Sequence, residues 1–222
     1  MEFSRKTYLD RLIERKHNGL VKILTGIHGC GKSYLLRKLF RDHLIKSGVA
    51  SDHICVYEFP RSSDRSMCSP DVFFADLKKR LPGTGRCYLL LDNVEYLSDA
   101  AQVLNSLNHE NRLDVYVTVS HASGFTTDVS TVFRGRCDVV HVFPLSFAEF
   151  VSGFDGGFHE SWAQYSRYGG MPAVVALESE EEKRSRLTSF LKDTCVADVA
   201  GYYDVGKTSE LEAFIRVIAS CA

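Results

Sequence analysis

The sequence predicts an α/β fold in which helices cover both faces of a mostly parallel sheet, followed by a purely helical region. Three observations support this. Five segments of strand length alternate with helical segments over residues 21–145, which is the order of a parallel sheet with crossover helices. The strand segments are apolar almost throughout, as strands buried on both faces are. After about residue 155 the strand pattern stops and only helical periodicity remains.

The elements can be placed in order along the chain. A helix is expected over residues 4–16. Strands are expected at 21–25, 53–59, within 86–97, at 114–120 and at 138–145. Between and after them we expect helices at about 32–47, 70–81, 99–110 and from 146. Four helical segments follow at 162–168, 172–178, 181–201 and 209–220. Residues 1–155 are therefore interpreted as the α/β core and 156–222 as a helical region.

Composition excludes some classes of protein. The formal net charge of −1 gives no overall attraction to nucleic acid or to an anionic membrane. No apolar run approaches the length of a membrane span, and the first residues lack the apolar segment of a signal peptide. The seven cysteines are odd in number and include no C-x-x-C pair. These features indicate a cytoplasmic protein without a membrane span.

A glycine-rich turn, GIHGCGKS, joins the first strand to the next helix at residues 26–33. Strand, turn, Lys-Ser and helix form the phosphate-binding pattern G-x-x-x-x-G-K-[ST]. Its glycines allow successive backbone N–H groups to face an anion, its lysine supplies a charge for the outer phosphates, and its serine offers a hydroxyl to Mg²⁺. We assign nucleotide binding to Gly26, Ile27, His28, Gly29, Cys30, Gly31, Lys32, Ser33 and the following Tyr34.

Asp92 ends the buried segment LLLD at 89–92. About 60 residues after a phosphate loop, an acid at a strand end is suited to hold Mg²⁺ beside the Ser33 hydroxyl. The alternative is that Asp92 only caps the turn that follows. We favour the metal role, so that Ser33 and Asp92 together form the predicted magnesium site.

Three further residues are candidates for catalysis near the phosphates. Asn93 follows the acid and can orient water but cannot accept its proton. Glu95 lies two residues on, and in an extended strand it would be about 6.6 Å from Asn93, out of reach of that water. Ser120 ends the fourth strand, where a hydroxyl can contact phosphate or water. We therefore predict slow hydrolysis, in which Asn93→Glu accelerates turnover and Glu95→Gln changes it little.

Arg136 lies in FRGR just before the fifth strand. From there an arginine could reach the phosphates of a neighbouring subunit, which would make the protein a homo-oligomer. The alternative is that Arg136 is an ordinary surface arginine surrounded by solvent. Thr118 and His121, which flank Ser120, could also contact the phosphate or cap the turn.

The chain also resembles a prokaryotic family of AAA-type ATPases within the AAA+ and STAND-like P-loop group. The resemblance rests on the segment from RKTYL through GIHGCGKSYLL and on YLLLDNVEYL, VTVSHAS, FRGR, VFPLSFAEF and YGGMPAVV. Members usually carry Arg-Arg in place of His28-Gly29 and Glu in place of Asn93, and they continue into a winged-helix segment and a further domain.

The resemblance implies an AAA+-type P-loop NTPase fold. Its parallel five-stranded sheet would have the phosphate-loop strand central and the Asp92 strand beside it, flanked by helices and followed by a small α-helical lid. Residues 156–222 would then form this lid and the start of a truncated C-terminal region. It also implies that the Gly169–Pro172 turn and the N-terminal helix around Tyr8 lie near the adenine.

The function we infer is Mg²⁺-dependent hydrolysis of ATP that drives a conformational switch. ATP and Mg²⁺ are the expected cofactors, and the effector, protein or nucleic acid, is not identified by the sequence. A non-hydrolysing nucleotide-binding switch and a P-loop kinase remain alternatives. A DNA-associated initiator-like ATPase is a third, by analogy only.

Overall fold

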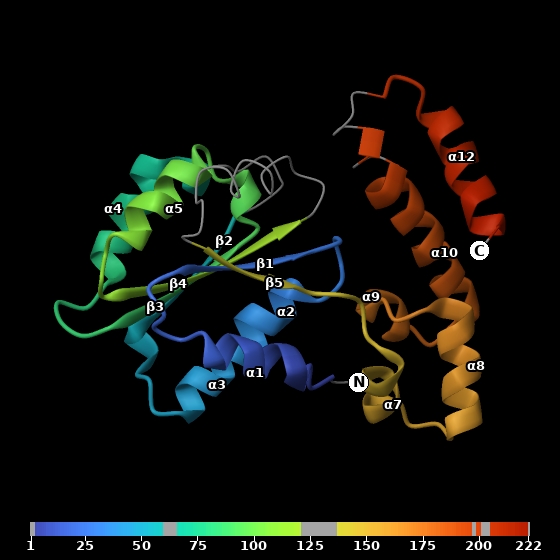
Figure 1. The fold of residues 1–222 in the computed structure, drawn as a ribbon, viewed down its shortest axis with the longest axis horizontal. Coiled ribbons are helices and arrows are strands. Elements are labelled where there is room, and N and C mark those ends of the chain that lie inside the picture. Colours follow the sequence, from blue (N-terminus) through green and yellow to red (C-terminus); the bar gives the residue numbers. More distant parts are fainter. Residues whose placement is uncertain (1–2, 60–65, 121–136, 197–198, 201–204, 222) are drawn as a thin grey trace.

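The computed structural model describes residues 3–59, 66–120, 137–196, 199–200 and 205–221 of the 222-residue chain. Its centre is a five-stranded sheet in the order β2-β3-β4-β1-β5, and every neighbouring pair is parallel. The strands are β1 (Val21–Gly26), β2 (Ile54–Glu58), β3 (Cys87–Asp92), β4 (Leu113–Ser120) and β5 (Cys137–His141). Figure 1 shows this sheet between two layers of helices. The parallel five-stranded sheet expected from the sequence is therefore confirmed.

Two details of the expected strand order are wrong, the first being that the central strand is β4 and not the phosphate-loop strand β1. The strand that ends at Asp92 does not lie beside β1, because β4 separates them. The Ser33 hydroxyl nevertheless reaches Asp92 Oδ1 at 2.8 Å. The helical stretch that begins at Lys32 contacts β1 through its first residues, Lys32–Tyr34, and contacts both β4 and β3 through Leu35–Phe40, so it crosses the intervening strand.

Successive residues of the strands supply two cores on the two faces of the sheet. Leu89 and Leu91 belong to the core that includes α4 (Pro70–Arg80) and α5 (Ala100–Asn108). Tyr88 and Leu90 belong to the other core, which includes residues of α1 (Lys6–Glu14) and of the helix that follows β1. This alternation is the period-two pattern of a strand buried on both faces.

The helices of the second face are α1 (Lys6–Glu14) and a continuous helical stretch after the phosphate loop. That stretch consists of α2 (Lys32–Tyr34), the π-helical η1 (Leu35–Phe40) and α3 (Arg41–Lys46). Short 3-10 turns connect other elements: η2 (Ser51–His53), η3 (Ser66–Cys68) and η4 (Val94–Tyr96). No described helix is long and apolar enough to cross a membrane.

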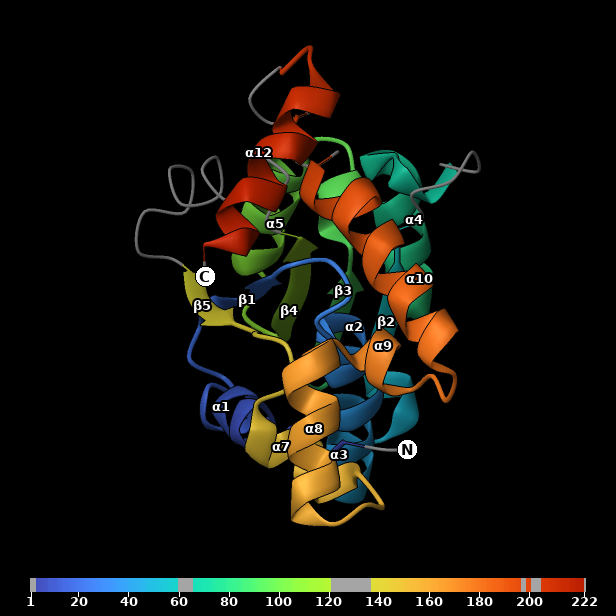
Figure 2. The ribbon, with the colours of Figure 1, turned by 90° about the vertical axis from the view of Figure 1, so that its right-hand side faces the viewer.

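A helical region follows the sheet, as expected. Its elements are α7 (Phe147–Gly153), α8 (Phe158–Tyr168), α9 (Pro172–Val175), α10 (Glu180–Phe190), η5 (Leu191–Val196) and α12 (Thr208–Ser220). The Ser146 side chain accepts a hydrogen bond from Glu149 N at 3.3 Å, and Glu149 Oε2 accepts one from Ser146 N at 2.9 Å. This capping box fixes the start of α7 directly after the sheet. Figure 2 looks onto the helical region, with α8 and α10 in front.

The turn before α9 packs directly on the phosphate loop. A Cβ built on Gly29 would lie 3.2 Å from Met171 Cε, and one built on Gly31 would lie 3.6 Å from Pro172 Cγ. The absence of side chains at these two loop positions therefore lets the helical region approach the loop closely. Figure 1 shows α9 beside the segment that links β1 to α2.

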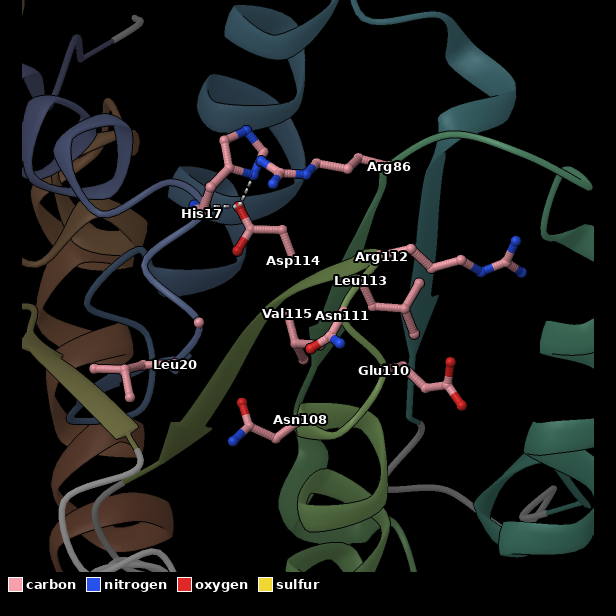
Figure 3. Close-up of a pocket in the computed structure, with 11 residues that line it drawn as sticks. His17, Leu20, Arg86, Asn108, Glu110, Asn111, Arg112, Leu113, Asp114 and Val115 are labelled. Atoms are coloured by element: carbon pink, nitrogen blue, oxygen red, sulfur yellow. Dashed lines mark hydrogen bonds and ion pairs between the residues drawn. The ribbon is translucent and has the colours of Figure 1, made fainter.

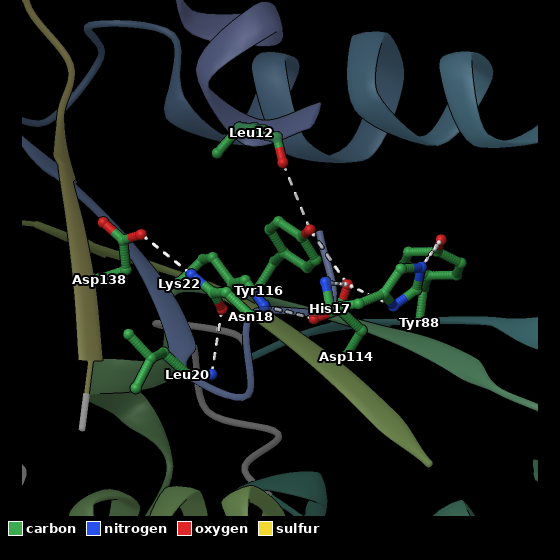
Figure 4. A network of polar contacts seen from close by, with 9 residues as sticks. All are labelled: Leu12, His17, Asn18, Leu20, Lys22, Tyr88, Asp114, Tyr116 and Asp138. Carbon is green, nitrogen blue, oxygen red and sulfur yellow. Dashed lines mark hydrogen bonds and ion pairs between the residues drawn. The ribbon is translucent and has the colours of Figure 1, made fainter. Parts of the chain in front are cut away.

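A buried polar network ties together the opposite, amino-terminal edge of the sheet (Figure 4). Lys22 on β1 forms an ion pair and a hydrogen bond with Asp114 on β4. His17 N and Tyr116 Oη also donate to Asp114, at 3.1 and 3.2 Å. Tyr88 Oη lies 3.0 Å from His17 Nε2. Because its buried charges are paired, the network joins the segment after α1 to three strands without an orphaned ion.

Candidate functional site

The phosphate loop is a tight turn at the carboxyl end of β1. Lys32 is only 5 % exposed, and its ammonium donates hydrogen bonds to Gly26 O at 2.8 Å and Ile27 O at 3.0 Å. Burial lowers the pKa of Lys32. The lysine thus lies folded against its own loop, where its charge is available to an anion held by the loop amides.

Gly26 occupies a position that no larger residue can take without distortion. Its φ is +150°, and a Cβ there would lie 2.2 Å from the Val142 carbonyl oxygen. Gly48 also has a positive φ, +91°, but a Cβ there would meet no atom within 4 Å. Alanine at either position would adopt a strained positive φ, but only alanine at residue 26 would also overlap another atom. Comparing the two substitutions therefore isolates the cost of the overlap.

We expect Gly26→Ala to lower the free energy of unfolding more than Gly48→Ala does. Backbone strain alone costs about 1–3 kcal/mol, and overlap at residue 26 adds about 1–3 kcal/mol more. Urea denaturation of the two variants measures the difference. Equal losses would show that the loop shifts easily and that its close approach to Val142 is not required.

The Asp92 carboxylate is completely buried and is held by three side chains. Ser33 Oγ and Thr118 Oγ1 donate to Oδ1 at 2.8 and 2.5 Å, and Arg37 Nη1 donates to Oδ2 at 3.2 Å. The structure thus brings together Ser33 and Asp92, the two residues assigned to magnesium. Thr118 is one of the groups that fix the orientation of the Asp92 carboxylate.

This donor set fits Mg²⁺. A serine hydroxyl and a carboxylate are the hard oxygen ligands that Mg²⁺ takes, and Mg²⁺ is usually held by one or two carboxylates together with substrate phosphates and waters. Among the described residues no group of three or more His, Cys, Asp and Glu is arranged to hold a metal. A metal at Asp92 would therefore need further oxygen ligands, such as those of water or phosphate, to complete its coordination.

The extended geometry expected after Asp92 is wrong. The strand ends at Asp92, Asn93 has a left-handed backbone with φ of 57°, and Val94–Tyr96 form the 3-10 turn η4. Asn93 N donates to Thr118 Oγ1 at 2.9 Å, which anchors the turn to β4. The reversal turns the chain sharply between Asn93 and Glu95, so the separation calculated for an extended strand does not apply.

Glu95 instead reaches the end of β4. Its Oε1 accepts a hydrogen bond from Ser120 N at 3.2 Å, and Ser120 is the register partner of Gly26, the first residue of the phosphate loop. Its other oxygen is buried and has no hydrogen-bond partner among the described residues. Burial raises the pKa of Glu95, while the nearby Lys32 charge opposes the rise. The site thus contains a carboxylate beside Lys32 with one oxygen unsatisfied.

Tyr8 contacts the segment that follows β5. Its hydroxyl accepts a hydrogen bond from Phe143 N at 3.2 Å, and its ring lines a hollow of about 600 Å³ together with the segment after β5. The described lining of this hollow includes no residue of the phosphate loop. The volume lies in the range of small-molecule sites, so contact of Tyr8 with a nucleotide base stays a prediction.

The pocket in Figure 3 lies at the opposite edge of the sheet and is lined by residues including His17, Arg86 and Asp114. Its volume is about 90 Å³, below the several hundred that ligand pockets usually have. This pocket is therefore too small to hold a nucleotide.

Two side chains that sequence reasoning missed lie beside Ser33 and Asp92, at the end of the site that the sequence assigns to magnesium. Arg37 contacts Asp92, and it also contacts Glu58 Oε2, at 2.5 Å. Arg37 follows Ser33 by one helical turn, which was the signal that could have placed both on one face. Glu58 is aligned with Asp92 between the adjacent strands β2 and β3, a register that the sequence does not reveal.

Three residues assigned to the site from the sequence lie outside the described residues. They are Arg136, Arg134 and His121, and their roles stay predictions.

The sheet, the phosphate loop and the acid facing its serine define a nucleotide-binding P-loop fold. The chain belongs to the AAA domain family, whose model matches residues 18–151. Residues 159–222 match a second model, described as a domain of unknown function (DUF8612). The fold is that of the AAA+ group.

The chain is also similar to two uncharacterized proteins. One, from Haemophilus influenzae, is 27 % identical over 222 residues, which cover 97 % of this chain and 55 % of that protein. The other, MJ1544 from Methanocaldococcus jannaschii, is 19 % identical over 211 residues, covering 89 % and 46 %. The chain therefore spans about half the length of these curated relatives.

Among solved structures, the chain is similar to a Saccharomyces cerevisiae Hsp104–ADP complex. The TM-score is 0.52 at 14 % identity, and the match covers 99 % of this chain and 38 % of the other. At this identity the similarity shows a shared fold alone.

Proposed function

We propose that this chain binds ATP together with Mg²⁺ and hydrolyses it to ADP and phosphate. The observation that carries the proposal is the convergence of three groups at one edge of the sheet. Lys32 lies within the loop, Ser33 contacts Asp92, and Glu95 contacts the β4 residue aligned with Gly26. These are a phosphate-binding cation, a pair of metal ligands and a carboxylate able to accept a proton.

In the proposed mechanism, Lys32 and the loop amides hold the phosphates, and Ser33 and Asp92 would hold Mg²⁺. When bound, Mg²⁺ supplies positive charge that offsets charge on the phosphates. The Glu95 carboxylate accepts a proton from the attacking water, and the hydrogen bond from Ser120 N keeps it in place. The turn at Asn93 brings Glu95 to this position, so the absence of an acid at residue 93 does not leave the site without a base.

A conformational switch is part of the proposal. Met171 and Pro172 border the phosphate loop, so a nucleotide that reshapes the loop also acts on the helical region. We further propose a cytoplasmic location, which the buried free thiols of Cys30, Cys55, Cys68 and Cys87 support. Association with further copies and with a protein or nucleic-acid effector belongs to the same proposal.

The test is ATP turnover and ATP binding, each measured with and without Mg²⁺. Mg²⁺-dependent release of phosphate supports the proposal. Saturable ATP binding without turnover would favour the second candidate, a non-hydrolysing switch, which the amide at Asn93 supports. Absence of ATP binding would reject both.

We expect Asp92→Asn to retain part of the ATP affinity but to lose its dependence on Mg²⁺. Asparagine is similar in size and can still accept the Ser33 and Thr118 hydrogen bonds, but it removes the negative charge that a metal requires. Calorimetric titration of ATP with and without Mg²⁺ measures this. If Mg²⁺ still tightened ATP binding as in the wild type, Asp92 would only fix the turn after β3.

A further inference from the structure

Arg37 stands between two carboxylates at the metal end of the site. Its Nη1 lies 2.5 Å from Glu58 Oε2 and 3.2 Å from Asp92 Oδ2. The Ser33 hydroxyl contacts the same Asp92 carboxylate from the other side, at Oδ1. One nitrogen of the delocalised guanidinium cation therefore contacts both acids, next to the hydroxyl assigned to Mg²⁺.

The two acids meet because of the sheet register. Glu58 is the last residue of β2 and is aligned with Asp92, the last residue of β3. The carboxyl ends of neighbouring parallel strands lie at the same edge of the sheet, where ligands of open α/β folds bind. Asp92 is fully buried whereas the Glu58 side chain is 54 % exposed, so Glu58 is the acid that can reorient.

Arg37 also has space to leave this position. It lines a hollow of about 660 Å³ on the outer side of the site, with Ser33, Tyr34 and Arg41. Its own side chain is 38 % exposed. A guanidinium released from the two carboxylates could therefore turn toward solvent without crossing the core.

We propose that Glu58 is a second carboxylate of the magnesium site and that Arg37 is the cation that neutralises Glu58 and Asp92 while no metal is bound. The inference rests on the proposed function, since it concerns the same site. Arg37 and a divalent cation compete for the same two carboxylates. Metal binding would therefore release the Arg37 side chain and replace its ion pair with Glu58 at the end of β2.

The experiment measures binding of Mn²⁺ in the absence of nucleotide, by electron paramagnetic resonance of the free ion. Arg37→Gln leaves two acids without their cation, so Mn²⁺ should bind at least about fivefold more tightly than to the wild type. Glu58→Gln added to Arg37→Gln should reverse most of this gain. Lys38→Gln is the matched control, because Lys38 is a cation that lines the same hollow and forms an ion pair with Asp42. It should match the wild type.

Equal Mn²⁺ affinity in Arg37→Gln and wild type would overturn the competition, and a gain that persists in the double variant would overturn the role of Glu58. Thermal unfolding of each variant confirms that the fold is retained. A second readout is the factor by which Mg²⁺ tightens ATP binding, which should be smaller in Glu58→Gln than in wild type. Failure of the proposed function appears separately, as absence of ATP binding or turnover in the wild type, because the Mn²⁺ titration contains no nucleotide.

Discussion

Lys32→Ala should remove most of the ATP affinity while leaving the fold intact. In the structure the ammonium is buried and its described hydrogen bonds go to two carbonyls of its own loop, so its loss leaves the apolar residues of the two hydrophobic cores in place. Hydrogen bonds to charged groups contribute about 1.5–3 kcal/mol each. The loss of one such contact weakens binding about 10–100-fold.

Calorimetric titration with ATP measures this effect, and circular dichroism checks the fold. Lys38→Ala is the control, since Lys38 lies six residues further along the same helical stretch and pairs with Asp42. It should bind ATP as the wild type does. An affinity of Lys32→Ala within a few-fold of the wild type would contradict the assignment of this turn as a phosphate loop.

Glu95→Gln should lower ATP turnover by about 10²–10⁴-fold, the usual contribution of a general base, with ATP affinity nearly unchanged. Glutamine can still accept the hydrogen bond from Ser120 N but cannot take up a proton at neutral pH. Single-turnover hydrolysis at saturating ATP measures the chemical step. Glu110→Gln is the control, because Glu110 lines the small pocket at the opposite edge of the sheet.

The pH profile adds an independent readout for Glu95. Burial raises its pKa above the ordinary value of 4.5, and only the deprotonated form accepts a proton. Turnover of the wild type should therefore fall as the pH drops through this raised pKa, and the residual activity of Glu95→Gln should lack this limb. If Glu95→Gln were fully active and Asn93→Glu raised turnover tenfold, position 93 would hold the water instead.

Folding stability should respond to Glu95 in a defined direction. Its raised pKa means that the folded state binds the proton more tightly than the unfolded state does. The carboxyl therefore costs no stability below the unfolded pKa, and it destabilises the fold progressively as the pH rises through the folded pKa. Glu95→Gln removes this dependence, so its unfolding free energy relative to the wild type should increase between acidic and neutral pH.

Local patterns were sufficient to predict the strands, the phosphate loop and the Ser33–Asp92 pair. Each depends on apolar periodicity or on a short motif, and such signals lie within a few residues of the chain. The order of the strands is different, because β4 enters between β1 and β3 through crossovers that leave no local trace. The family resemblance implied that the Asp92 strand lies beside β1, and this was wrong. The predicted pairing of Ser33 with Asp92 is nevertheless present.

The turn after Asp92 was missed for a related reason. Asn93 adopts its left-handed backbone while its N–H bonds to Thr118, and Glu95 bonds to Ser120, both on β4. These partners are about 25 residues away in the chain, so local alternation could not reveal them. Asparagine tolerates this backbone better than most residues do, which was the one local sign that the strand ends there.

The contact between Met171, Pro172 and the phosphate loop has a consequence for communication within the molecule. Because Met171 and Pro172 border this loop, a nucleotide bound there as proposed would act on the helical region through direct contacts. Information about nucleotide occupancy need not travel through the sheet or along a relay of side chains. A change in the shape of the loop would be passed to the helical region through the van der Waals contacts of Met171 and Pro172.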